Sequence, residues 1–375
     1  MKNAAFPKPT GEYAVGTLTY TVQNDREETL PRGGMRSVAA RVYYPVLKEN
    51  VRDLSRITAL SDPMLKGFRR AFMVAPDFRK HPEGNTSECY AGAPEIPGQK
   101  FPLIMFNHGY NSYREGNSFL CIDLASHGYV VISVTHSLES MCTELDDGTV
   151  LFYDKKLTRK MYSPMLGSMI AIYRLVKAKG SNEELARKFD ALQRKYCRFM
   201  MERLPEWVKD TEAALRYAKQ NLSGLIDFDR GIGASGHSFG GNTAYALCAE
   251  NPEFVCGINM DGALFGDYTE TVQTKPFLQI SCADNTNVVT RAYLRHTKPV
   301  YQALFQNMKH MGFADAKHMI PMKSAMGKLD PDVLHNALCR CHLAFFDACL
   351  KGLRDSPDFG IIDGVTISEF PPDHA

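Results

Sequence analysis

Short apolar runs recur between residues 101 and 281, and longer stretches with regularly spaced polar positions separate most of them. Each run has the length of a strand and lacks polar alternation, which is typical of strands buried on both faces of a sheet. The runs are PLIMFNHG (102–109), YVVISV (129–134), GIGASG (231–236), EFVCGINM (253–260) and PFLQIS (276–281). This alternation predicts an α/β fold with a mostly parallel central sheet flanked by helices.

The N-terminal region has a different pattern. Residues 14–22 (AVGTLTYTV) and 36–45 (RSVAARVYYP) are rich in β-branched and aromatic side chains, and a polar turn separates them. This pattern predicts an antiparallel hairpin. Residues 46–100 contain Pro and Gly throughout and are expected to wrap over the surface as an irregular segment. Because no internal repeat interrupts the pattern, we expect residues 1–375 to form a single domain.

Residues 138–204 are longer than a simple crossover between parallel strands. Met161, Met165 and Met169 are spaced four apart, so they share one face of a predicted helix. This face is either ordinary core or part of a cap whose adaptable side chains line an acyl pocket. We expect residues 138–204 to form a cap inserted over one end of the sheet.

Composition and charge narrow the possible partners. The net charge of the 375 residues is only +2, which predicts no nucleic-acid partner. No apolar run approaches the ~20 residues of a membrane-spanning helix. The N-terminus lacks the apolar stretch of a secretory signal, so we expect a cytoplasmic protein. The ten cysteines are expected to be reduced and mostly buried, and their spacing predicts no metal site and no cofactor.

The strongest chemical signal is GASGHSFGGNTAYALC, at residues 233–248. A strand followed by G-x-S-x-G and a helix is the nucleophile elbow of α/β-hydrolases. Ser238 would sit in the sharp turn, where strand and helix approach so closely that Gly236 and Gly240 must lack side chains. The alternative is a glycine-rich connector. A phosphate-binding loop is disfavoured because GxGxxG and GxxxxGK[ST] are both absent.

A serine nucleophile needs a base and an orienting acid, which follow the serine in this fold in the order acid, then histidine. Two acids qualify from the residues alone, because Asp261 and Asp284 each end a predicted strand. Among the later histidines, His318 lies in the loop-like ADAKHMIPM and is the expected base. His310 is predicted to lie in or before the last strand, and His335 and His342 on an amphipathic helix.

An oxyanion hole needs two backbone donors. The loop FNHGYNSY (106–113) follows a predicted strand, and its His108-Gly109 turn would aim the N–H of Tyr110 inward. The second donor would be the N–H of Phe239, directly after the nucleophile. We expect His108 to brace the turn by hydrogen bonding and not to act as a base.

Several segments together resemble the plasma and intracellular type II platelet-activating-factor acetylhydrolases and their bacterial relatives. These segments are FNHGYNSYREGNSFLCIDLASHGYVVISVTH, GASGHSFGGNTA, CGINMDGALFG and the late KHM. The resemblance implies an α/β-hydrolase fold and calcium-independent hydrolysis of short or oxidised acyl esters. It also implies Asp261 as the acid, His318 as the base, and Tyr110 and Phe239 as oxyanion donors.

The sequence therefore predicts a serine carboxylic ester hydrolase that works through Ser238, His318 and Asp261 and forms an acyl-enzyme. Its substrate would be a small-molecule ester, and a lipid ester is one candidate. The alternatives are another activity of the same fold, such as a dienelactone hydrolase, a cutinase-like enzyme or a serine peptidase. A non-catalytic binding protein with a hydrolase fold is a further alternative. The oligomeric state stays open.

Overall fold

The computed structural model describes residues 6–30, 32–79, 82–157, 160, 169–320 and 323–372. Within these residues, eleven strands form one sheet in the spatial order β13-β12-β11-β10-β9-β5-β6-β2-β1-β4-β3. The strands of this sheet are β1 (Ala14–Glu27), β2 (Met35–Val46), β3 (Arg56–Thr58), β4 (Thr86–Ala91), β5 (Leu103–Asn107), β6 (Val130–His136), β9 (Ile232–His237), β10 (Phe254–Met260), β11 (Phe277–Cys282), β12 (Val300–Phe305) and β13 (Val365–Phe370).

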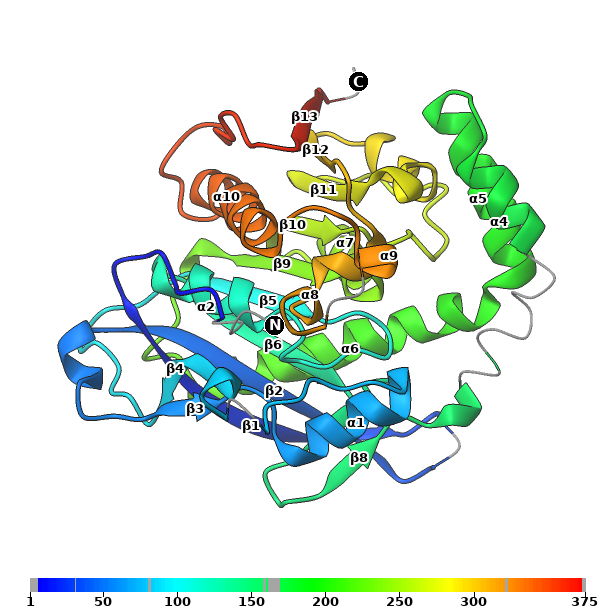
Figure 1. The fold of residues 1–375 in the computed structure, drawn as a ribbon. Helices are drawn as coiled ribbons and strands as arrows, with labels where there is room; N and C mark the ends of the chain where they lie inside the picture. Colours follow the sequence, from blue (N-terminus) through cyan, green and yellow to red (C-terminus); the bar gives the residue numbers. More distant parts are fainter. Residues whose placement is uncertain are drawn as a thin grey trace.

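The centre of the sheet is parallel, as the apolar runs predict. Strands β6, β5, β9, β10, β11 and β12 pair in parallel, whereas β1 pairs with β2 in the antiparallel hairpin expected near the N-terminus. The hairpin joins the parallel part through β2 and β6 and is drawn in blue in Figure 1. Strands β4 and β3 lie beyond it, so β3 is the edge strand opposite β13. The register pairs Asn107 with Gly236 and His237 with Met260. The carboxyl ends of β5, β9 and β10 therefore meet at one edge.

Helices cover both faces of the sheet. On one face, α2 (Ser118–Ser126) and α10 (Pro331–Cys349) enclose a core with Phe106, Ile258 and Phe346. On the other face, α6 (Arg198–Asn221) and α7 (Phe239–Glu250) enclose a core around the fully buried Trp207. None of the helices in the described ranges has the length and apolarity that crossing a bilayer requires.

The segment expected as a cap contains the β7–β8 hairpin, α4, α5 and the start of α6. Their bounds are β7 (Cys142–Glu144), β8 (Val150–Phe152), α4 (Met169–Val176) and α5 (Asn182–Tyr196). Helices α4 and α5 stand at the right-hand side of Figure 1, where Leu175 and Phe189 pack with Phe265 and Val288. The predicted stripe residues Met161 and Met165 lie outside the described residues.

Residues 46–100 are more regular than the sequence predicts. They contain β3, β4 and the helix α1 (Asp62–Phe72), which begins at a Ser61 cap whose side chain accepts a hydrogen bond from the N–H of Met64. Helix α1 buries Met64 and Phe68 and packs beside β7. Two short helices, α8 (Ala316–Met319) and α9 (Lys323–Met326), follow β12 in the chain.

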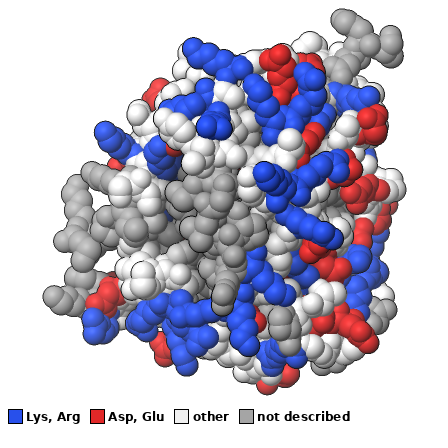
Figure 2. Space-filling model, turned by 90° about the vertical axis from the view of Figure 1, so that its right-hand side faces the viewer, with Lys and Arg blue, Asp and Glu red and all other residues white. Residues whose placement is uncertain are grey.

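The face that carries α4 and α5 mixes charges of both signs, as Figure 2 shows. Arg194 pairs with Asp267 at 3.0 Å, and Arg198 pairs with Glu202 at 2.8 Å within one helix. This mixture agrees with the small net charge of the chain.

Candidate active site

Ser238 lies at the turn between β9 and α7 in a backbone conformation that few residues adopt. Its φ is 56° and its ψ is −121°. A Cβ atom on Gly240 would lie 2.0 Å from the carbonyl oxygen of Asn107, and one on Gly236 would lie 2.4 Å from Gly240. Both positions therefore require glycine, since real Cβ atoms do not approach other atoms so closely. This is the geometry of a nucleophile elbow.

Ser238 begins a chain of two hydrogen bonds at the sheet edge. Its Oγ lies 2.9 Å from Nε2 of His310, and Nδ1 of His310 lies 2.7 Å from Oδ2 of Asp261. Because an ionised carboxylate only accepts hydrogen bonds, Nδ1 carries the proton and Nε2 can accept from the serine hydroxyl. The arrangement can remove a proton from Ser238 and stabilise the imidazolium that forms.

Backbone and side-chain donors hold the Asp261 carboxylate in place. Asp261 directly follows β10 and is fully buried. Its Oδ1 accepts a 2.7 Å hydrogen bond from the N–H of Cys282, and its Oδ2 accepts a 2.7 Å hydrogen bond from Nδ2 of Asn285. The other sequence candidate, Asp284, instead pairs with Lys309 at the surface. Of the two acids, only Asp261 is joined to a histidine that contacts Ser238.

The histidine between Ser238 and Asp261 is His310, and the expectation of His318 is corrected here. Strand β12 ends at Phe305, earlier than the sequence suggests, so His310 already lies in the loop beyond the sheet edge. His318 lies in α8, where its ring stands edge-on to Phe119 at 5.2 Å between centroids. Burial lowers the pKa of His318 to about 4, and no hydrogen bond joins it to the serine in the described part of the chain.

The loop expected to supply the oxyanion donor lies against the nucleophile. A Cβ atom on Gly109 would come within 3.2 Å of Cβ of Ser238. His108 donates from Nδ1 to the carbonyl of Gly109 at 2.7 Å, and burial lowers its pKa to about 3, so it is neutral and braces the turn as expected. The N–H of Asn111 donates to the carbonyl of Glu139 at 2.9 Å, which anchors the loop beyond Tyr110. Phe239 is the first residue of α7, where N–H groups lack partners within the helix.

His237 contributes to the site and was not predicted from the sequence. Its Nε2 donates to the carbonyl of His310 at 3.1 Å, and the two rings lie 5.0 Å apart. Burial and the neighbouring His310 lower the pKa of His237 to about 3, so the ring is neutral. This hydrogen bond ties the histidine loop to the elbow. The signal in the sequence is the histidine directly before the serine in G-H-S-F-G.

A buried charge network lies behind the oxyanion loop. Arg36 is fully buried and contacts Asp210 at 2.6 Å, Glu28 at 2.8 Å and Glu139 at 3.2 Å. His136 donates from Nδ1 to Asp210 at 3.0 Å, and its Nε2 lies 3.1 Å from the side-chain amide of Asn107. Burial lowers the pKa of His136. The network connects β2 and α6 to the residues that precede the His108-Gly109 turn.

One group of potential metal ligands occurs among the described residues. Asp123, His335 and Cys339 offer ligand atoms within 4.8 Å of one another, and all three are buried. Asp123 accepts a 2.6 Å hydrogen bond from the N–H of Thr10, and Sγ of Cys339 lies 3.5 Å from Nε2 of His335. None of the three lines the cavity beside Ser238.

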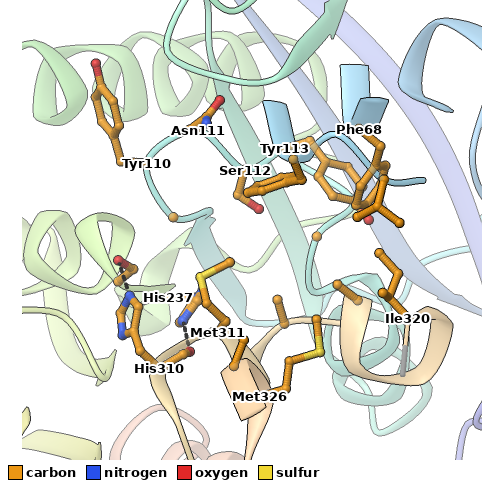
Figure 3. Close-up of a pocket in the computed structure, with 18 of the residues that line it drawn as sticks. Phe68, Tyr110, Asn111, Ser112, Tyr113, His237, His310, Met311, Ile320 and Met326 are labelled. Atoms are coloured by element: carbon orange, nitrogen blue, oxygen red, sulfur yellow. Dashed lines mark hydrogen bonds between the residues drawn. The ribbon is translucent and has the colours of Figure 1, made fainter. Parts of the chain in front are cut away.

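A cavity of about 400 Å³ adjoins the hydrogen-bonded chain (Figure 3). Ser238 and His310 line it, together with residues of α1, of the 109–116 loop and of the chain after His310. Its volume lies in the ~300–1,000 Å³ range of small-molecule sites. A substrate in this cavity would have direct access to the Ser238 hydroxyl.

Comparisons with known proteins find relatives over nearly the whole chain. The family model described as platelet-activating factor acetylhydrolase, isoform II, matches residues 1–359. Platelet-activating factor acetylhydrolase of Cavia porcellus is 30% identical over 97% of this chain and 84% of its own length. The protein of the same name from Canis lupus familiaris is 24% identical over 96% of this chain and 80% of its own length.

A solved structure has the same fold. The ferulic acid esterase of Streptomyces cinnamoneus superimposes with a TM-score of 0.70 over 96% of this chain and 97% of its own, at 21% identity. The match confirms the predicted α/β-hydrolase fold. Together with the match of the family model over nearly the whole sequence, it leads to one conclusion: the chain belongs to the platelet-activating factor acetylhydrolase isoform II family.

Proposed function

We propose that the protein is a serine carboxylic ester hydrolase with a catalytic triad of Ser238, His310 and Asp261. The observation that carries the proposal is the pair of hydrogen bonds of 2.9 Å and 2.7 Å that links the three side chains. Membership of the acetylhydrolase family supports the same activity.

The reaction follows from the position of each group. Ser238 Oγ attacks the ester carbonyl carbon while its proton passes to His310 Nε2, and Asp261 stabilises the imidazolium through Nδ1–H. The N–H groups of Tyr110 and Phe239 stabilise the oxyanion of the tetrahedral intermediate. His310 then protonates the leaving alcohol, and an acyl-enzyme on Ser238 remains. Water attacks the acyl-enzyme with His310 as base and releases the acid.

The substrate class is proposed from the family and the cavity together. The relatives are named for the removal of an acetyl group from platelet-activating factor. The proposed substrate is therefore an ester, such as a lipid ester, whose acyl group is short or modified. The cavity beside Ser238 has largely apolar walls, which suits a lipid-like ester.

The organisation and location of the protein are also proposals. A hydrophobic core cluster that extends from Tyr20 to Val300 supports one α/β-hydrolase domain over residues 1–375, with 138–204 as an inserted cap. All ten cysteines lie in the described ranges and are free, and nine of them are buried. Free thiols support a reducing compartment such as the cytoplasm.

Rates on short aryl esters test the proposed activity. We expect wild type to hydrolyse p-nitrophenyl acetate and Ser238→Ala to lose at least about 10⁴-fold in kcat. The matched control is Ser55→Ala, because Ser55 is an exposed serine outside the site. Hydrolysis by Ser238→Ala at the wild-type rate would overturn the proposal.

A further inference from the structure

The carboxylate of Asp261 has more partners than the orientation of one histidine requires. Within the described part of the chain, its Oδ2 accepts hydrogen bonds from Nδ1 of His310 at 2.7 Å, Nδ2 of Asn285 at 2.7 Å and Sγ of Cys282 at 3.3 Å. Its Oδ1 accepts another from the N–H of Cys282 at 2.7 Å. His310 therefore shares one carboxylate oxygen with two other side-chain donors.

Asn285 also lies against the imidazole ring. Its Nδ2 is 3.2 Å from Nδ1 of His310 and 3.5 Å from the backbone carbonyl oxygen of Asp261. The amide presents Nδ2 at this point, because an ionised carboxylate accepts hydrogen bonds and would repel the amide oxygen. Since Nδ1 also carries a proton, the two N–H groups do not bond to each other. The positive end of the amide dipole therefore faces the ring.

Both donors come from the chain at the end of β11. Cys282 is the last residue of β11, and Asn285 lies in the short 3₁₀ helix Ala283–Val288 that follows it. Asp261 directly follows the neighbouring strand β10, and its φ is 57°. Neither Cys282 nor Asn285 lines the cavity beside Ser238. Replacement of either residue therefore leaves the walls around the substrate unchanged.

We propose that Asn285 and Cys282 are positioning residues that hold the Asp261 carboxylate and weaken its support for a proton on His310, an inference that rests on the proposed triad. Each donor withdraws negative charge from Oδ2, and the Asn285 amide also repels a positively charged ring. Both effects favour the neutral imidazole, which is the form that accepts the Ser238 proton. The two residues therefore extend the activity toward lower pH.

Other ionisable groups surround Asp261 and His310, namely His108, His237, Cys282, Asp284, Tyr293 and Lys309. Burial keeps His108 and His237 neutral by lowering the pKa of each to about 3. Burial raises the pKa of the Cys282 thiol to about 12 and also raises the pKa of Tyr293, so both are neutral. Asp284 and Lys309 form an ion pair at the surface.

One carboxyl group farther along the same segment titrates near neutral pH. Burial raises the pKa of Asp315 to about 8, and its Oδ2 accepts a 2.9 Å hydrogen bond from Ser118 of α2. Asp315 is present in every variant below, so its titration cancels when their pH profiles are compared.

The pH dependence of kcat/KM on phenyl acetate tests the role of Asn285, because this profile reports the essential groups of the free enzyme. Asn285→Leu keeps the approximate size of the side chain but removes the donor. The midpoint of the acid limb should therefore rise by about 0.5–1 pH unit. The midpoint is read from the shape of the profile, so it does not depend on the fraction of the enzyme that folds.

Two replacements of Cys282 should move this midpoint in opposite directions. Cys282→Ala removes the thiol donor and should raise the midpoint, whereas Cys282→Ser introduces a stronger hydroxyl donor and should lower it. Both variants keep the backbone N–H that bonds to Oδ1 of Asp261. A change in packing alone would not reverse the direction of the shift between the two variants.

Asn287 offers a matched control in the same 3₁₀ helix. Its Nδ2 donates to the carbonyls of Leu175 and Ala178 at 2.8 and 2.9 Å, so it binds the end of α4 instead of the Asp261 carboxylate. Asn287→Leu should lower stability and leave the midpoint at the wild-type pH.

The outcomes separate this inference from the proposed function. A midpoint at or below the wild-type value in Asn285→Leu, or shifts of the same sign in the two Cys282 variants, would overturn the positioning role. A folded Asn285→Leu with no activity at any pH would also overturn it, because Asn285 would then be essential and not a modulator. If Ser238→Ala instead hydrolyses phenyl acetate at the wild-type rate, the esterase proposal itself is wrong.

Discussion

At the scale of single residues, the reactivity of Ser238 depends on which histidine lies against its hydroxyl. The Ser238 hydroxyl donates its 2.9 Å hydrogen bond to Nε2 of His310, whose side chain is 36% exposed, so water and substrate can reach the ring. His318 is packed against Phe119 instead. The two residues lie eight positions apart, and only the replacement of His310 should abolish the activity.

Replacement of each histidine should separate the two roles. His310→Ala removes the proposed base and is expected to lower kcat on p-nitrophenyl acetate by about 10⁴-fold or more. His318→Gln is expected to keep kcat within a few-fold of wild type. If His318→Gln were inactive although folded, and His310→Ala active, the assignment of the base would be wrong.

His318 should affect stability at acidic pH. Its pKa is about 4 in the folded protein but about 6.5 in an unfolded chain. Between these values the unfolded chain binds a proton that the folded protein does not, so His318 lowers the free energy of unfolding as the pH falls. Urea unfolding near pH 7.5 and near pH 5 measures how much free energy of unfolding is lost between the two pH values. This loss should be smaller in His318→Gln than in wild type. An equal loss in both proteins would contradict the buried neutral state.

At the residue scale, the sequence is most informative where the spacing of residues is rigid. The G-x-S-x-G pattern predicts a sharp turn at Ser238, and the structure has this turn, with space for glycine alone at both flanking positions. The sequence reasoning favoured His318 because the loop after β12 has no fixed length. In the structure β12 ends at Phe305, and His310 is the histidine that contacts Ser238 and Asp261. The position of a residue in such a loop depends on tertiary contacts and not on the local sequence pattern.

At the scale of elements, buried ion pairs connect α6 to the β1–β2 hairpin and to the chain after β6. Arg36 on β2 and Asp210 on α6 are both fully buried and form an ion pair at 2.6 Å. Arg203 and Glu139 add a second pair at 2.7 Å. No apolar periodicity in the sequence predicts these contacts, because Arg36 and Asp210 are 174 residues apart and Arg203 and Glu139 are 64 apart.

Loss of one partner in this network should be costly. Asp210→Ala leaves the Arg36 guanidinium buried without its closest carboxylate and is expected to lower the free energy of unfolding by about 3–5 kcal/mol. The matched control is Glu202→Ala, which removes the exposed partner of Arg198 on the same helix. This variant should change the free energy of unfolding by less than ~1 kcal/mol. Equal unfolding midpoints in urea for the two variants would contradict this account.

Helix α1 illustrates what the pattern of the sequence could not predict. DPMLKGFRRAF has a Ser cap and buries Met64, Gly67 and Phe68, so the helix is amphipathic. Its location at the cavity depends on packing beside β7 and on the contact of Phe68 with Tyr113. The parallel strands were predictable because their apolar runs are continuous, whereas a short surface helix has no such signal.

At the scale of the whole molecule, two hydrophobic layers enclose the sheet and bury most of the thiols. Nine of the ten cysteines are buried, and Cys349 is partly exposed. The sheet order and the helix layers agree with the α/β architecture predicted from the alternation of strands and helices. The ends of three neighbouring strands bring residues 107, 237 and 260 together, which is why the site lies at this edge.

The burial of the cysteines predicts their reactivity. In the native protein, a thiol reagent such as DTNB should modify at most about one cysteine rapidly, since thiolates react only where they are accessible. After unfolding in urea without reductant, all ten should react, because none is in a disulfide. Fewer than ten reactive thiols in the unfolded chain would contradict the free state of the cysteines.

The most direct test of the central claim is covalent labelling with a fluorophosphonate, followed by mass spectrometry of the modified peptide. We predict one label for each chain on Ser238, labelling at the wild-type rate in His318→Gln and greatly slowed labelling in His310→Ala. A label on another residue, or labelling that is equally fast without His310, would contradict a Ser238–His310–Asp261 triad.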